Sequence, residues 1–282
     1  MSKILFRGKD HIEPSFEERK KAATNFPSFS RLGFEKINDI ENVFSRTMTL
    51  EEVKKKSDLY YWDMCLFNKL FYLKESYINL MVNYNRGVPS DLNNPNESTD
   101  INGVNHFLFS YYTETIYFFH FSIREYIYQI LNVYFDLELT EIEVTINNVF
   151  EKLSVKMKEN NENKRKNKGN GIIINEIIKT NKTIKAIKVI LEKYNKASKK
   201  TNNIRNEFTH TYPSSLPDLR ASIGTLDQTI KIDNTENMKI QTYKTYRRGT
   251  GKHTKPSEFI EDINKSLKVL ETFIKELKTE LI

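Results

Sequence analysis

The spacing of hydrophobic residues predicts a chain built mainly from long helices. From Thr49 to about Tyr84, apolar residues recur every three or four positions, which is the period of an amphipathic helix. Glu51 and Glu52 stand in the first turn behind Thr49, and these residue types favour a helix N-terminus. The segment Asn85-Arg86-Gly87-Val88-Pro89 contains the glycine and proline that typically end a helix. The first long helix is therefore expected between these two signals.

A second helix is predicted from about Gly103 to Leu137, and apolar positions surround it on nearly every side. A helix with one wet face would carry polar residues along that face, so this one should lie at the centre of a bundle or at a subunit interface. Four polar residues interrupt its most apolar stretch: Glu114, His120, Arg124 and Glu125. The stretch is therefore a poor membrane span and a good core helix.

Local signals divide the middle of the chain. Thr140 and Glu143 have the Thr-x-x-Glu spacing of a capping box, so a third helix is expected from there to about Met157. Residues 158–170 are of low complexity and rich in lysine and asparagine, which is typical of a mobile basic loop. A fourth helix is then expected from about Gly171.

The fourth helix should reach His210 or Thr211, because Pro213 cannot continue a helix. A break near Asn181 is one alternative within it. Residues 1–45, in contrast, show no sustained period. We expect them to form an N-terminal extension, an extended arm or short helices, that packs on or flanks the bundle.

The pattern changes from helical to β-type within residues 214–255. Residues 229–233 and 238–243 flank a four-residue polar turn, which predicts a β-hairpin inside this insertion. Pro256 then opens a last helix that runs to about Leu281. We therefore expect a mainly α fold, a helical bundle of about five long helices with a small β-hairpin insertion before the last helix. This helical domain should span residues 46–282.

Charge is concentrated in one part of the chain. The 282 residues carry a net charge of +7, but residues 152–200 alone hold 15 Lys and Arg against 4 Asp and Glu, so the remainder is slightly acidic. A concentrated positive field favours polyanions, and nucleic acid first among them. The alternative is a solvated lysine and asparagine face without a ligand.

Two simple features bound the class of protein. Cys65 is the one cysteine, which excludes a disulfide framework and a cysteine-rich zinc site. The first ten residues, MSKILFRGKD, become charged before an apolar stretch develops, so no secretory signal is expected there. We expect a cytoplasmic protein without a membrane segment.

The five histidines differ in their surroundings. His120 and His106 lie among aromatic and core-type residues and are expected to be structural, while His11 falls in the N-terminal extension. His210 and His253 remain as candidates for chemistry. His210 closes the segment Ile204-Arg-Asn-Glu-Phe-Thr-His, at the expected end of the fourth helix.

A helical wheel groups the polar residues of this segment. At 100° per residue, Ile204 and Phe208 face the core together. The broad opposite face carries a cation, an amide, a hydroxyl and an imidazole: Arg205, Asn206, Thr209 and His210. An imidazole can move protons near neutral pH, and a guanidinium can hold a phosphate and neutralise charge in its transition state. No carboxylate cluster accompanies them, so neither a metal nor another cofactor is expected.

These residues resemble the signature of the HEPN superfamily, an Arg-x4-His motif at the end of a long bundle helix. Arg205 to His210 fits this motif, including a polar residue after the arginine, and Tyr212 extends it to the Arg-x4-His-x-Tyr form of HEPN toxins. The resemblance implies a homodimer in which two motifs meet at one cleft. It also implies a metal-independent endoribonuclease that leaves a 2′,3′-cyclic phosphate, acting in toxin–antitoxin or phage-defence systems.

The resemblance also assigns roles to residues and suggests partners. His210 would be general base or acid and Arg205 would bind phosphate, with Asn206 and Thr209 orienting the substrate. Tyr212 would be a candidate site for inactivating adenylylation by a nucleotidyltransferase antitoxin. RNA-backbone contacts are expected from five basic residues: Lys199, Lys200, Arg247, Arg248 and Lys252.

The same spacing occurs a second time. Arg248 and His253 are also separated by four residues, but glycines lie between them in a stretch expected to be a flexible basic loop. Only the first pair has a helix to fix its geometry. Alternatives to the enzyme are a non-catalytic RNA-binding or dimerisation module with the same fold, and a purely structural role in which Arg205 forms a salt bridge and His210 caps its helix.

Overall fold

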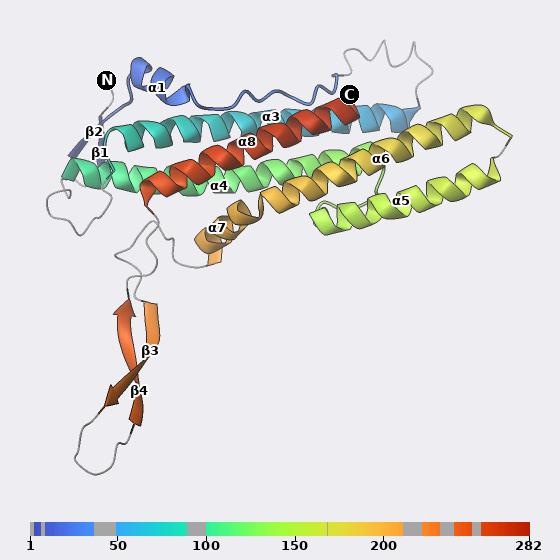
Figure 1. The fold of residues 1–282 in the computed structure, drawn as a ribbon. Helices are drawn as coiled ribbons and strands as arrows, with labels where there is room; N and C mark the ends of the chain where they lie inside the picture. Colours follow the sequence, from blue (N-terminus) through green and yellow to red (C-terminus); the bar gives the residue numbers. More distant parts are fainter. Residues whose placement is uncertain are drawn as a thin grey trace.

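The computed structural model describes the backbone of residues 3–6, 9–36, 49–88, 100–167, 169–210, 222–231, 240–249 and 255–282. Side chains are described in residues 13–36, 49–88, 104–167, 169–204, 206 and 255–282. Helices make up most of this part of the chain, so the prediction of a mainly α fold is confirmed (Figure 1).

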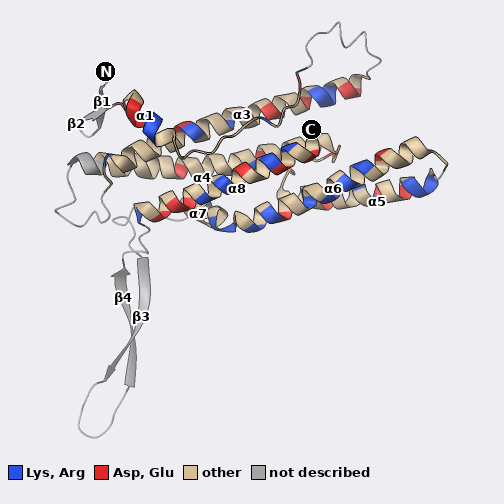
Figure 2. Cartoon of the chain, turned by 45° about the horizontal axis from the view of Figure 1, so that its top comes forward, with Lys and Arg blue, Asp and Glu red and all other residues tan. Residues whose placement is uncertain are grey.

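The helices α3 (Leu50–Asn85) and α4 (Asp100–Tyr134) pack along each other as an antiparallel pair (Figure 1). Thr49 caps α3: its hydroxyl accepts a hydrogen bond from the Glu52 N–H, and the Glu52 carboxylate accepts one from the Thr49 N–H at 2.8 Å. Helix α4 begins three residues before the predicted Gly103. It contacts α3, α5, α7 and α8, and few charged residues lie along it (Figure 2). It is the central helix of the bundle.

The last helix, α8 (Pro256–Leu281), begins at the predicted proline and covers the bundle against α4 and α6. Its predicted core stripe is confirmed, because each of these side chains is buried: Phe259, Ile263, Leu267, Leu270, Phe273, Ile274, Leu277 and Leu281. The stripe joins one continuous apolar core with residues of α3, α4, α5 and α6.

Helix α5 (Ile146–Lys166) differs from its prediction at both ends. Thr140 and Glu143 do bond to each other, but the Thr140 hydroxyl donates to the carboxylate at 2.8 Å and does not cap a helix, so the segment forms a turn. The helix starts after Thr145, whose hydroxyl accepts from the Asn148 N–H. The prediction of a helix start at Thr140 is therefore wrong.

The prediction of a mobile loop over residues 158–170 is also wrong for most of that range, because α5 continues to Lys166. Lysine and glutamate are good helix formers, and three basic residues in the last turn complement the helix dipole: Lys164, Arg165 and Lys166. The connection to α6 (Gly171–Ala197) begins at Asn167. The two helices form an antiparallel pair whose tip extends past the end of α4 (Figure 1).

The fourth predicted helix is divided, but not at Asn181. The amide of Asn181 joins α6 to α5 by hydrogen bonds with Asn160 at 2.9 Å and Asn161 at 3.1 Å, so it lies within an unbroken helix. The break occurs at Ser198, where α6 ends and α7 (Lys199–His210) begins.

The N-terminal residues lie along the outer side of α3. Strands β1 (Lys3–Phe6) and β2 (Lys9–Ile12) pair antiparallel, and α1 (Phe16–Ala23) follows. Helix α1 contacts α3, where Arg19 pairs with Glu75 and Glu18 with Arg86. The side chain of Arg86 holds the pKa of Glu18 at about 2.

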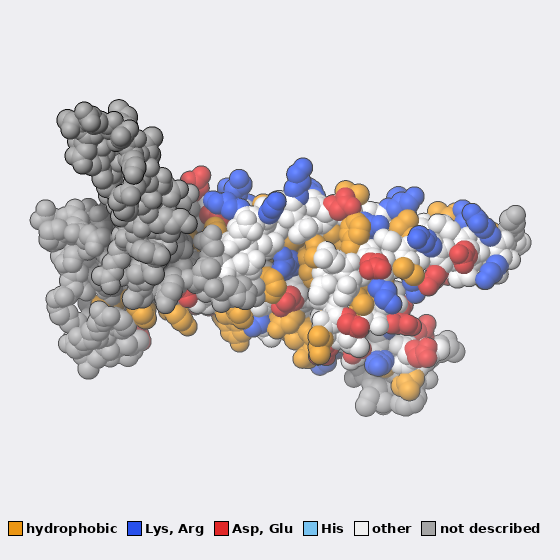
Figure 3. Space-filling view, turned by 90° about the horizontal axis from the view of Figure 1, so that it is seen from below, with side chains coloured by type: hydrophobic (Ala, Val, Ile, Leu, Met, Phe, Trp, Pro, Cys, Tyr) orange, Lys and Arg blue, Asp and Glu red, His pale blue; other side chains and the backbone are white. Residues whose placement is uncertain are grey.

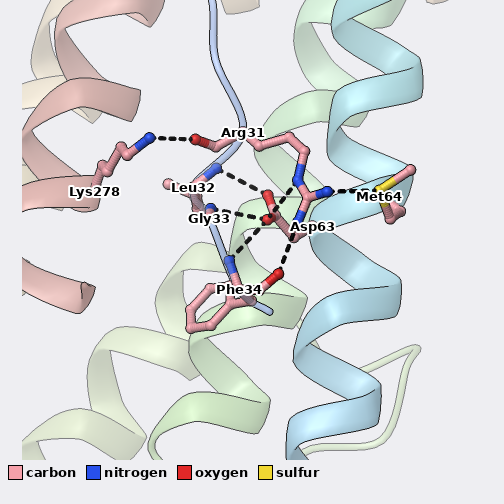
Figure 4. Close-up of polar contacts among 7 residues, drawn as sticks. All are labelled: Arg31, Leu32, Gly33, Phe34, Asp63, Met64 and Lys278. Atoms are coloured by element: carbon pink, nitrogen blue, oxygen red, sulfur yellow. Dashed lines mark hydrogen bonds and ion pairs between the residues drawn. The ribbon is translucent and has the colours of Figure 1, made fainter. Parts of the chain in front are cut away.

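A buried carboxylate attaches the segment after α1 to the bundle. The backbone N–H groups of Leu32, Gly33 and Phe34 donate to Asp63 of α3 at 2.9 to 3.1 Å, and the Arg31 guanidinium pairs with it (Figure 4). Gly33 has a φ of 112°, a conformation that glycine adopts without strain. Lys278 of α8 donates to the Arg31 carbonyl at 3.0 Å, so this segment joins α3 to α8.

Strands β3 (Ser222–Lys231) and β4 (Ile240–Gly249) pair antiparallel along their whole length. Both are longer than the two β-type runs of the sequence. Arg247 and Arg248, expected in a flexible loop, lie on β4 opposite Gly224 and Ile223. The reason is that threonine and tyrosine residues, which favour strands, continue to Tyr246.

Within the part of the chain that the structure describes, no helix combines the length and the apolar character that crossing a bilayer requires. The aromatic helix α4 is included in this result.

Candidate functional site

The short helix α7 carries the Arg-x4-His residues, and Ser198 sets its direction. Ser198 has φ −88° and ψ 2°, which ends the regular α6 geometry. Its N–H donates to the Tyr194 carbonyl at 2.8 Å, and its carbonyl accepts from the Asn202 N–H at 2.9 Å. One buried residue therefore closes α6 and opens α7.

Polar and apolar contacts together attach α7 to the bundle. The Arg124 Nη1 of α4 donates to the Asn202 Oδ1 at 2.9 Å. Thr201 is buried, and Ile204 is half-buried against the main core, as the helical wheel predicts. The position of Arg205 lies one turn after Thr201 and three residues after Asn202 on the same helix. The Arg124–Asn202 contact is therefore next to the first residue of the motif.

A chain of polar groups links the beginning of α7 to α8. Lys200 pairs with the Asp262 Oδ1 at 2.7 Å, and the Tyr117 hydroxyl of α4 donates to the Asp262 Oδ2 at 2.8 Å. Burial and the neighbouring Asp262 carboxylate raise the pKa of Tyr117 well above its usual value, so it stays a hydrogen-bond donor. Lys199 is exposed.

His120 of α4 is a core residue, as predicted. Its ring stacks on Tyr194, which stacks on Phe273 with ring centroids 4.0 Å apart. Complete burial lowers the pKa of His120 to about 4, although a hydrogen bond to the Ser266 backbone acts in the opposite direction. The imidazole is therefore neutral at pH 7 and closed to solvent, which does not suit a general acid or base. His106 is buried as well.

The predicted site residues are placed to different extents. Arg205, Thr209 and His210 have their backbone on α7, and the side chain of Asn206 on the same helix is exposed. Lys199 and Lys200 begin that helix, so six of the candidates share one element. The two arginines of β4 are on another element, while Tyr212 and Lys252 lie outside the described residues.

Sequence reasoning missed the residues that hold α7. Arg124, Asn202 and Asp262 come from three helices far apart in the chain, and no local pattern connects them. Arg124 did give one signal, since it is a lone cation in an otherwise aromatic helix. Such a residue requires a partner when its helix is buried.

No three His, Cys, Asp or Glu side chains gather as metal ligands in the described part of the molecule. On α7 itself, the exposed side chains that the structure describes are two lysines and two asparagines: Lys199, Lys200, Asn203 and Asn206. Ammonium groups donate only and amides can donate, so this surface suits an anion such as phosphate better than a cation.

Comparison with known protein families gives a match. A family model described as Cthe2314-like HEPN matches residues 62–278, which include α4, α7 and all but the last three residues of α8. No curated protein and no solved structure matches the chain.

Proposed function

Because the chain belongs to the HEPN family, whose model matches more than half of its length, we propose that it is a metal-independent endoribonuclease. The match supports a nuclease or RNA-binding module of HEPN type. The observation that favours cleavage is the Arg-x4-His motif, Arg205 to His210, at the end of α7. The polar contacts of α7 with α4 and α8 add support, because a catalytic helix requires a fixed orientation.

The proposed reaction is attack by a ribose 2′-hydroxyl on the adjacent phosphorus. His210 accepts the hydroxyl proton as the P–O2′ bond forms, and the P–O5′ bond breaks as the 5′ oxygen takes up a proton from water. Arg205 neutralises the negative charge that develops on the phosphoryl oxygens. Asn206 and Thr209 orient the substrate. The products are a 2′,3′-cyclic phosphate and a 5′-hydroxyl, and the reaction needs no metal.

Basic residues supply the affinity in this proposal. Lys199 and Lys200 lie one to two turns before Arg205 on α7, and Arg247, Arg248 and Lys252 are proposed as further contacts with the RNA backbone. Contacts of this kind are electrostatic, so RNA binding should weaken steeply as salt is added.

We further propose that two copies form a dimer with a composite site. An exposed aromatic patch supports this: Phe107, Tyr111 and Phe118 share one face of α4 and are 46% to 55% exposed. Phe71 and Tyr72 of α3 are exposed to a similar extent. Figure 3 shows hydrophobic side chains gathered along one long edge of the body, with lysine and arginine mostly along the opposite edge. Large exposed apolar patches typically mark interfaces.

A role as a toxin or phage-defence effector follows from the same proposal, with an antitoxin as partner and Tyr212 as the residue an adenylylating antitoxin would modify. A chain that is toxic when expressed alone, and harmless as Arg205→Ala, would support this role. Equal toxicity of both chains would contradict it.

The decisive assay is RNA cleavage in EDTA by the wild-type chain and by Arg205→Ala. The proposal predicts cleavage by the wild type and a loss of at least about a hundredfold in the variant. Salt-sensitive RNA binding without new RNA termini would instead favour the non-catalytic RNA-binding module.

A further inference from the structure

A cleft of about 300 Å³ lies between α6 and α8, next to the start of α7. Its lining is mostly apolar and includes four buried or half-buried apolar and aromatic side chains: Ile190, Tyr194, Val269 and Phe273. Tyr194 and Phe273 stack with an interplanar angle of 10°, and both are almost fully buried. Both rings therefore lie beneath the cleft and support its shape, while the surface that a ligand would meet includes the exposed Ala197 and Thr272 and the half-buried Val269.

The rim of the cleft is basic. Lys193, Lys265 and Lys268 surround it, with one carboxylate, Glu276, that already pairs with Lys193. Among the described residues, neither Lys265 nor Lys268 has an ion-pair partner, and both are exposed. Figure 2 shows basic positions along both helices. The rim therefore offers two free cations to a ligand that carries negative charge.

An apolar cleft with a cationic rim fits a ligand that has a flat apolar part beside an anionic group. A nucleotide of single-stranded RNA has this chemistry, because its base can insert between the apolar walls while its phosphate meets lysine. The position also suits RNA: Ala197 lines the cleft, and Arg205 follows eight residues later, after the turn at Ser198. The cleft and the motif are therefore close along the chain, on either side of the turn at Ser198.

We propose that this cleft binds one unpaired nucleotide of the RNA substrate, with the base inside and its phosphate at Lys265 and Lys268. The proposal rests on the proposed function, since it assumes that RNA is the substrate. It adds a binding subsite outside the Arg-x4-His motif, and this subsite selects RNA that is single-stranded beside the cleavage position.

The test is fluorescence anisotropy with a fluorescein-labelled oligouridine of twelve nucleotides, measured with His210→Ala protein to prevent cleavage. Thr272→Trp fills the cleft from an exposed rim position. Thr279→Trp is the matched control, because Thr279 is also exposed on α8 and makes the same hydroxyl bond to the residue four positions earlier, but does not line the cleft. We expect Thr272→Trp to weaken binding about tenfold, the usual worth of one stacked base, and the control to bind like its parent.

An abasic oligonucleotide of the same length separates base insertion from charge attraction. The parent should bind it about tenfold more weakly than oligouridine, and Thr272→Trp should not weaken that binding further. Lys268→Glu should weaken binding of both oligonucleotides, and Lys275→Glu, the same charge change outside the cleft, should have a smaller effect.

Three results would overturn the proposal: no oligouridine binding by the parent, unchanged binding by Thr272→Trp, or a Thr272→Trp chain that changes only self-association in light scattering. The last would make the cleft an interface between copies.

The nuclease proposal and the cleft proposal can fail independently. If the wild type cuts no RNA but Thr272→Trp weakens binding, the cleft remains a nucleotide site and the cleavage proposal falls. If the wild type cuts and Thr272→Trp binds normally, only the cleft proposal falls.

Discussion

Helix α7 lies beside the beginning of α8 (Figure 1), and the two helices are held in opposite ways. Helix α8 has 26 residues and a continuous buried stripe, so apolar packing is the main cause of its position. Helix α7 has 12 residues and, among its described side chains, one half-buried aliphatic residue, Ile204. Its other contacts are polar: Asn202 with Arg124, and Lys200 with Asp262.

The packing of α8 mainly determines the stability of the chain, whereas the polar contacts of α7 mainly determine the orientation of the motif. Removing apolar atoms from α8 should cost much of the free energy of unfolding, because the core cannot refill the space. Removing a polar contact from α7 should cost little stability, but it should change how the motif is presented. Substitutions in the two helices should therefore affect different measurements.

The largest effect is expected from the α8 stripe. Leu267 is fully buried, so Leu267→Ala should lower the free energy of unfolding by about 3 kcal/mol in urea titration, through lost transfer energy and a cavity. Thr279→Ala, on an exposed position of the same helix, should change it by less than about 0.5 kcal/mol. If both substitutions lowered the free energy of unfolding equally, α8 would not be held by its buried stripe.

A smaller effect concerns the core next to α7 and depends on pH. The pKa of His120 is about 4 in the folded chain against 6.5 when exposed, so the unfolded chain binds the extra proton between these values. The neutral imidazole therefore adds to the free energy of unfolding above pH 6.5, and this addition is lost as the pH falls toward 4. Between pH 7 and pH 5 the free energy of unfolding should fall by about 2 kcal/mol from this cause. His120→Gln should remove this part of the pH dependence in urea titrations at both pH values. If His120→Gln loses as much stability between pH 7 and pH 5 as the wild type does, the lowered pKa of His120 is not the cause of the loss.

The contact between α7 and α4 should give the opposite result to Leu267→Ala. Asn202→Ala should lower stability by about 1 kcal/mol or less, because the Arg124–Asn202 hydrogen bond is partly exposed. RNA cleavage should fall about tenfold, mainly in kcat, since misplacement of α7 disturbs the motif. Asn203→Ala, on an exposed neighbouring position, is the control. A loss of stability without a loss of kcat would make Asn202 merely structural.

The smallest effect is expected from exposed ion pairs. Lys193 pairs with Glu276 at the cleft rim, where the lysine side chain is 61% exposed. Lys193→Ala should change the free energy of unfolding by less than about 0.5 kcal/mol. A larger loss would mean that the two helices are held at their surface as well as by their core.

The parts of the fold that were predictable have local causes. Thr49, Glu52 and the apolar period define α3, and Pro256 and the stripe define α8. The end of α5 was missed because its lysine and asparagine composition is typical of loops, while the packing against α6 that holds Asn160 and Asn161 has no local signature. The break at Ser198 was missed for a similar reason, since one serine in a polar stretch does not predict a turn.

In the candidate site, too, only the features with a local sequence signal were predictable. Arg205 and His210 follow from a motif within six residues and its place at a helix end. The contacts that orient the helix do not, because Arg124 and Asn202 are 78 residues apart and meet only in the folded chain. The cleft between α6 and α8 is likewise a product of packing.

We propose above that the motif on α7 cuts RNA without a metal. The direct measurement is cleavage of a single-stranded RNA in EDTA, with analysis of the new termini, by the wild type, His210→Ala and His253→Ala. His253 belongs to the second Arg-x4-His pair of the sequence and is the matched control. We expect 2′,3′-cyclic phosphate ends from the wild type and from His253→Ala, and a loss of cleavage of at least about a hundredfold in His210→Ala. Equal cleavage by all three chains, or loss of wild-type cleavage on chelation, would contradict this proposal.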